Sequence, residues 1–106
     1  MAPRLAIVAL ALPIVMGCRK NLCAASCPDD ERYVEQCKKT VATWEGQPCR
    51  AERMELEECA KPHTVCSKGS IDETASFESA KTACASQLAT EKTCCATHAT
   101  SHACLP

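Results

Sequence analysis

The chain has few large apolar side chains, so it has little from which to build a core. Only three of its 106 residues are aromatic. Beyond the first seventeen residues the large apolar side chains number a dozen: Leu22, Tyr33, Val34, Val41, Trp44, Met54, Leu56, Val65, Ile71, Phe77, Leu88 and Leu105. A domain of this size with so thin a core usually depends on covalent cross-links or a metal.

The chain also lacks a basic excess and lacks the motifs of common enzymes. Without Arg4, eleven lysines and arginines face thirteen acidic residues, a net charge of about −2. Nucleic-acid binding needs clustered basic residues, so no nucleic-acid partner is expected. No Cys-x-x-Cys motif marks a thiol oxidoreductase, and no nucleophile, base and orienting group stand together as in a hydrolase. We therefore expect neither an enzyme nor a cofactor.

One apolar run opens the chain, and no second one follows. Residues 1–4 carry a positive charge at Arg4, and residues 5–16 are uninterruptedly apolar. A helix needs about 20 apolar residues to cross a bilayer, so this run is too short to span one. Residues 1–17 are therefore predicted to be a signal peptide, which directs the remaining chain out of the cytoplasm.

Cysteine is the residue that is abundant. The chain has eleven: Cys18, Cys23, Cys27, Cys37, Cys49, Cys59, Cys66, Cys84, Cys94, Cys95 and Cys104. Such a density in a short exported chain is typical of a disulfide scaffold made in an oxidising compartment.

The odd number of cysteines is explained if one of them does not pair. Val15-Met16-Gly17-Cys18 resembles the lipobox of bacterial lipoproteins, although Met16 is bulkier than the residue usual at its position. The resemblance implies that Cys18 is acylated and becomes the new N-terminus, with residues 18–26 as a tether to the membrane. Ten cysteines then remain for five disulfides.

An ordinary secretory signal is the alternative. Val15-Met16-Gly17 also has the small-x-small pattern of general signal peptidase, and Ala24-Ala25-Ser26 offers a later cleavage site. Cleavage at either place would release a soluble, freely secreted protein.

Residues 27–106 are predicted to form one all-α domain of three to four helices, beginning with an α-hairpin. Acidic residues after Pro28 and lysines ten residues later suit a helix over 28–44. A second helix is expected over 49–61. Ser70 and Glu73 match a capping box that opens a third, and its apolar stripe is Phe77, Ala80, Cys84 and Leu88. No segment alternates with period two, so no strand is expected.

Two cysteine pairs repeat one spacing. Nine residues separate Cys27 from Cys37, and nine separate Cys49 from Cys59. On a helix each pair is about 15 Å apart, too far for a disulfide within the pair. Two antiparallel helices would instead join as Cys27–Cys59 and Cys37–Cys49.

The spacing resembles the twin Cys-x9-Cys hairpins of the coiled-coil-helix family. That family lacks an export leader, so its localisation and roles are not transferred. The partners of the other six cysteines (Cys23, Cys66, Cys84, Cys94, Cys95 and Cys104) stay open, except that the neighbours Cys94 and Cys95 should bridge to different partners.

The C-terminal tract contains the candidate metal ligands. On a helix, Cys94, His98 and His102 would stack at four-residue steps, and thiolate with imidazole suits zinc or copper(I). The alternative is that these cysteines form disulfides and the histidines are solvated. It is favoured because a metal bound through one cysteine would leave another cysteine without a disulfide partner. Tyr33 and Trp44 are either a recognition pair or, at helical spacing, part of the core.

Three functions fit these features. The first is a non-enzymatic interaction or structural module that is held at a membrane by lipid on Cys18 and binds an unidentified protein partner. The second is a freely secreted cysteine-rich effector, signal or toxin-like protein. The third is an extracytoplasmic metal-binding protein.

The intact mass of the unreduced protein from its native host distinguishes the first two. We expect the mass of residues 18–106 plus acyl chains, less ten hydrogens for five disulfides. A mass without lipid would remove the anchor, and hydrogens that are not lost would indicate free thiols.

Overall fold

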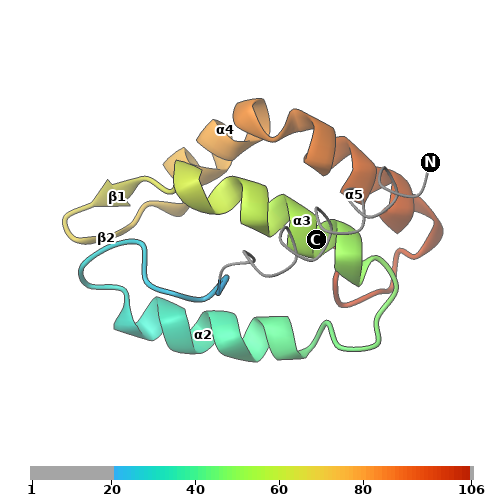
Figure 1. The fold of residues 1–106 in the computed structure, drawn as a ribbon, viewed down its shortest axis with the longest axis horizontal. Coiled ribbons are helices and arrows are strands. Elements are labelled where there is room, and N and C mark those ends of the chain that lie inside the picture. Colours follow the sequence, from blue (N-terminus) through green and yellow to red (C-terminus); the bar gives the residue numbers. More distant parts are fainter. Residues whose placement is uncertain (1–20, 106) are drawn as a thin grey trace, which may run out of the picture.

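The computed structural model describes residues 21–105, which form a small helical bundle with one short hairpin of strands (Figure 1). Residues 1–17 and Cys18, on which the signal peptide and the lipidation site were predicted, lie outside the described residues. The elements in chain order are α2 (Glu31–Ala42), α3 (Arg50–Ala60), the 3-10 turn η1 (Lys61–His63), β1 (Cys66–Ser67), β2 (Ser70–Ile71), α4 (Glu73–Ala83) and α5 (Ala85–Thr97). The predicted disulfide-rich helical bundle is confirmed.

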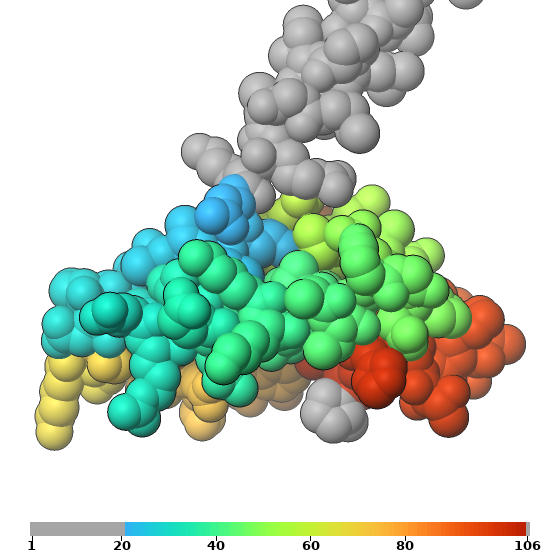
Figure 2. All heavy atoms as spheres, turned by 90° about the horizontal axis from the view of Figure 1, so that it is seen from below, coloured from blue at the N-terminus to red at the C-terminus, as the bar shows by residue number. Residues whose placement is uncertain are grey.

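The core lies where α3 packs against α4 and α5. Leu56, Cys84 and Leu88 are its buried centre, and Cys59 and Leu105 pack against them. Helix α3 reaches this core with one narrow apolar face, because most of its other residues are charged. Helix α2 runs antiparallel to α3 along the other side of the molecule (Figure 1) and has no fully buried residue. Seen from that side, α2 forms much of the visible surface (Figure 2).

The third predicted helix is interrupted at Cys84. Its backbone there (φ −116°, ψ 33°) ends α4 and begins α5. Cys84 is completely buried and bonded to Cys59, so the bridge fixes the break in the middle of the core. Ala80 and Leu88 are buried as the stripe predicted, whereas Phe77 keeps 49% of its surface exposed.

Five disulfides join the ten cysteines of the described chain. They are Cys23–Cys37, Cys27–Cys66, Cys49–Cys94, Cys59–Cys84 and Cys95–Cys104. Cys94 and Cys95 do bridge to different partners, as predicted. Each bridge is expected to contribute roughly 2–4 kcal/mol to stability.

The predicted bridges Cys27–Cys59 and Cys37–Cys49 are wrong. Helix α2 starts only at Glu31, so Cys27 lies in the turn before it and shares no helical face with Cys37. Cys49 is the left-handed N-cap of α3 (φ 69°) and is bonded to α5. Because α3 packs on α4 and α5, its cysteines find partners there rather than on α2.

The absence of strands was also predicted wrongly. Ser67 and Ser70 pair across a turn in which Lys68 and Gly69 both have positive φ (53° and 85°), the requirement of a tight type I′ hairpin. Two residues a strand are too few to show alternation. Ser70 therefore belongs to β2, and the cap of α4 is Asp72, whose carboxylate accepts the Ala75 N–H.

Asp30 ties this hairpin to the turn before α2. Asp30 is 2% exposed. Its carboxylate accepts hydrogen bonds from the N–H of Cys27 at 3.1 Å and from the N–H of Ile71 at 3.3 Å. The neighbouring Asp29 N–H donates to the Gly69 carbonyl at 2.7 Å. Together with the Cys27–Cys66 disulfide, these bonds fasten the start of α2 to the rest of the molecule.

Replacing Asp30 with alanine is expected to lower the free energy of unfolding by about 1–3 kcal/mol, because the buried N–H of Cys27 and the half-buried N–H of Ile71 lose their acceptor. Urea unfolding measures the loss. The matched control is Asp29→Ala, since that exposed side chain makes no hydrogen bond to a described residue and should cost less than about 0.5 kcal/mol. Equal effects of the two substitutions would contradict this role for Asp30.

Candidate functional site

An apolar cavity of about 170 Å³ lies between α2 and the body formed by α3, α4 and α5. All three aromatic residues of the chain, Tyr33, Trp44 and Phe77, line it. Aliphatic side chains complete the walls: Leu22, Val41, Leu56, Ile71, Leu88 and Leu105. The chain's largest apolar groups therefore surround a space instead of filling it.

The helices place these residues for simple reasons. Tyr33, Cys37 and Val41 recur at helical spacing and form the inner face of α2, which is half-buried because it borders the cavity. Leu56 and Ala60, one turn apart on α3, form the facing wall. The Cys23–Cys37 disulfide fixes the middle of α2 to the preceding segment, so that α2 is held by covalent bonds rather than by side-chain packing.

Trp44 is a buried part of the cavity wall. Its ring is 3% exposed, and the Arg53 guanidinium lies over it at 4.7 Å from the ring centroid. Arg53 also donates to Glu57 at 2.9 Å and to the Ala103 carbonyl at 3.2 Å. This set of contacts ties α3 to both the end of α2 and the C-terminal segment, which keeps the wall in place.

Two lysines belong to the cavity lining. The Lys61 ammonium donates to the Ala24 carbonyl and to the Ser26 hydroxyl. The Lys81 ammonium lies 5.7 Å from the Phe77 ring centroid and 3.5 Å from Glu78. The carboxylate in the lining, Glu57, is paired with Arg53, and Lys81 is paired with Glu78, so these charges are compensated and Lys61 is the basic group bonded to neutral partners.

The phenol of Tyr33, in the cavity lining, has a raised pKa. Burial raises the pKa of its phenol above the usual 10.0, and the negative charges of Glu57, Asp30 and Glu73 raise it further. Its hydroxyl therefore stays protonated and remains a hydrogen-bond donor at the edge of the apolar space.

The candidate metal ligands Cys94, His98 and His102 do not share one helix. Helix α5 ends at Thr97, so His98 is only its C-cap and His102 lies in the terminal loop. The Cys94 sulfur is bonded to Cys49. The helical stack of Cys94, His98 and His102 is thus broken, because the chain needs residues 98–104 to return Cys104 to Cys95.

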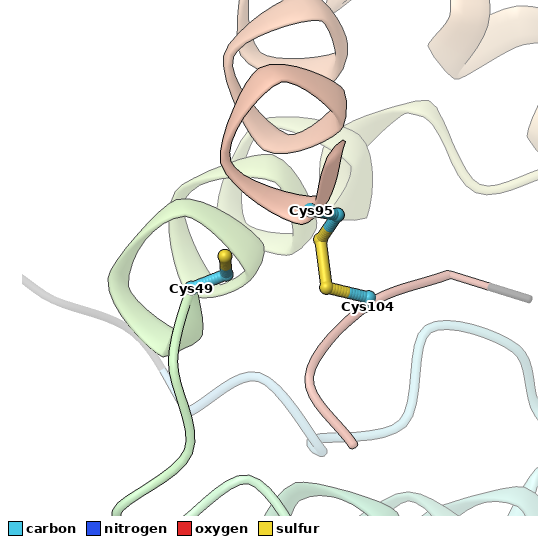
Figure 3. A group of neighbouring side chains, drawn as sticks. All are labelled: Cys49, Cys95 and Cys104. Atoms are coloured by element: carbon cyan, nitrogen blue, oxygen red, sulfur yellow. A yellow bond between two sulfur atoms is a disulfide. The ribbon is translucent and has the colours of Figure 1, made fainter. Parts of the chain in front are cut away.

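Sulfur atoms nevertheless gather near this end of α5. The Sγ atoms of Cys49, Cys95 and Cys104 lie within 4.8 Å of one another, with the Cys95–Cys104 disulfide beside Cys49 (Figure 3). The Cys49 and Cys94 sulfurs also lie within 4.8 Å of a Glu52 carboxylate oxygen. In the structure these sulfurs are all disulfide-bonded, so none is available as a thiolate.

Sequence reasoning missed two buried carboxylates and the cavity itself. Glu91 is 1% exposed and accepts the Leu105 N–H at 3.0 Å, which holds the C-terminus on α5. The acidic residues after Pro28 are expected within a helix, whereas Asp30 is the N-cap that precedes α2. No signal marked Glu91, which is one acidic residue in a polar stretch. Tyr33 and Trp44, expected to be either a recognition pair or part of the core, both line the cavity, Tyr33 from α2 and Trp44 from just beyond its end.

Comparisons with protein-family models, with curated proteins and with solved structures find no match to this chain. Among the described residues, no helix has the length and apolar content to cross a membrane.

The ionisation of Tyr33 gives a test of this geometry. Because the folded protein holds the phenol proton more tightly than the unfolded chain, stability that is present below pH 10 is lost as the pH rises above it. Ultraviolet absorbance of the single tyrosine should give a midpoint above 10.0, and Tyr33→Phe should reduce the loss of stability above that pH. A midpoint at or below 10.0 in the folded protein would show that the phenol is solvated.

Proposed function

We propose that the protein is a non-enzymatic exported module that binds the single hydrocarbon chain of an amphipathic, anionic molecule, such as a fatty acid. The observation that carries the proposal is the gathering of every aromatic side chain around one apolar cavity. Aromatic and aliphatic walls with a few placed polar groups are the usual composition of a small-molecule site.

The size of the cavity favours one chain over a larger ligand. Sites for drug-sized molecules measure about 300–1,000 Å³, whereas an apolar cavity of about 150 Å³ takes up benzene. The space here, about 170 Å³, lies close to the second value. A single ring or a segment of about six chain carbons fits such a volume, so a longer alkyl chain would enter with one end only.

The border of the cavity favours an anionic head group. Lys61 lines the cavity, and a lysine in such a wall can lay its apolar stem along it while its ammonium stays in water. A carboxylate there would exchange the contacts of Lys61 with Ala24 and Ser26 for a charge-assisted bond.

The site of action in this proposal is the membrane surface. Five disulfides in a small domain suit an oxidising compartment outside the cytoplasm. Lipid on Cys18 would hold the domain there, only four residues before Leu22 of the cavity wall. A mature protein without lipid would instead favour a freely secreted carrier or effector.

Trp44, the only tryptophan, reports on binding directly. Titration with dodecanoate is expected to change its fluorescence in a saturable way. Ala60→Leu places extra carbon atoms in the cavity and should weaken binding roughly tenfold or more, since excluding about two ligand methylenes removes about 1.6 kcal/mol.

The matched control is Ala51→Leu on the exposed face of the same helix, which should bind as the natural chain does. Decyltrimethylammonium bromide, a cationic amphiphile, should bind more weakly than dodecanoate. Unchanged affinity in Ala60→Leu, with the fold intact by circular dichroism, would exclude the cavity as the binding site.

A further inference from the structure

Residues 98–105, the C-terminal strap, are fastened to the domain, whereas the last residues of most domains are poorly ordered unless they are tied down. After α5 the strap turns back toward α3 (Figure 1), and the Cys95–Cys104 disulfide ties it to α5. The Ser101 hydroxyl donates a hydrogen bond to the Pro48 carbonyl at 2.6 Å. The strap is therefore held against both α5 and the loop that precedes α3.

Two charged side chains fix the part of the strap around Leu105. Arg53 donates to the carbonyl of Ala103, a residue without exposed surface, at 3.2 Å. The Glu91 carboxylate accepts the Leu105 N–H at 3.0 Å. Glu91 is 1% exposed, and no basic side chain of residues 21–105 forms an ion pair with it. Burying a carboxylate without a cation is costly. An apolar side chain at this position would avoid the cost but could not accept the N–H, so the carboxylate serves to hold Leu105.

Leu105 lies at the boundary between the cavity and the core. It lines the cavity and also packs against the buried cluster of Leu56, Cys84 and Leu88. Its side chain therefore occupies volume that a ligand chain would otherwise reach, and it keeps that place because the strap is fastened on both sides of it.

We propose that Leu105, positioned by Glu91, sets the length of hydrocarbon that the cavity accepts, an inference that rests on the proposed function. The space that Leu105 leaves open holds about six chain carbons. The ligand class is therefore the medium-chain alkanoates, since carbons beyond the cavity stay in water and add no affinity.

A wall at this place has a measurable effect on affinity. Each ligand methylene that leaves water for the cavity should raise the affinity roughly fourfold. Truncating Leu105 to alanine removes most of the side chain, and the surrounding side chains relax only partly into the space. Room for about two further ligand methylenes should result.

A homologous series of alkanoates from butanoate to dodecanoate tests the proposal, with Trp44 fluorescence as the measure of binding. In the natural chain the affinity should rise with length and level off at about eight carbons. In Leu105→Ala the rise should continue for about two more methylenes. Decanoate should then bind roughly tenfold more tightly than to the natural chain, whereas hexanoate, which fits both cavities, should bind equally.

Two variants of Glu91 test its role as a positioning residue. Glu91→Ala removes the acceptor of the Leu105 N–H and should extend the levelling length as Leu105→Ala does. Glu91→Gln keeps an oxygen that can accept this bond and should retain the natural levelling length. A merely structural role would lower stability without moving the levelling length.

Two further variants serve as controls. Leu105→Met conserves the side-chain volume, and Val65→Ala truncates an exposed residue outside the lining, so both should level off as the natural chain does. If Leu105→Ala does not fold, Leu105→Val should extend the series by about one methylene.

The outcomes separate this inference from the function on which it rests. An unchanged levelling length in the folded Leu105 variants, with dodecanoate still bound, would overturn the length selection and leave the proposed function standing. Failure of every alkanoate to bind the natural chain would overturn both.

Discussion

The Cys59–Cys84 disulfide occupies the place that a large apolar side chain holds in most small domains. It lies among Leu56 and Leu88 at the contact of α3 with α4 and α5, and Cys84 has no exposed surface. Because the chain has so few large apolar residues, burial of apolar area alone would leave the fold marginal. The covalent bond fixes the break between α4 and α5 and so determines how these two helices lie against α3.

Covalent attachment also explains why the cavity beside α2 is not filled by side chains. Disulfides attach α2 and its preceding turn at Cys37 and Cys27, and Asp30 adds hydrogen bonds at the same end. A helix attached in this way does not need to bury its apolar face completely in order to stay in place. Tyr33 and Val41 can therefore face an open space, which in a domain stabilised only by packing would cost stability.

Part of this architecture follows from local sequence patterns. Helical periodicity, charges near helix ends and the proline and glycine breaks placed α2 and α3 to within a few residues, since these signals act over one or two turns. The disulfide partners did not follow, because equal spacing of Cys27–Cys37 and Cys49–Cys59 carries no information on which helices pack together. The positive φ of Gly69 and the burial of Asp30 were not predicted either, because both depend on how the hairpin packs against the start of α2.

The candidate site was only partly predictable for a related reason. The spacing of Tyr33 and Trp44 identified an inner face, but whether such a face meets another side chain or a cavity depends on residues distant in the sequence, such as Phe77. Likewise, the stack of Cys94, His98 and His102 assumes a helix that continues to residue 102, whereas the return of Cys104 to Cys95 ends that helix at Thr97.

The most direct test of the central claim is a measurement of nuclear Overhauser contacts between dodecanoate and the disulfide-intact protein. The account predicts contacts from the methylene protons of the ligand to the rings of Tyr33, Trp44 and Phe77 together, since all three line the cavity. Contacts confined to the exposed ring of Phe77, or an absence of contacts to Trp44, would contradict binding within the cavity.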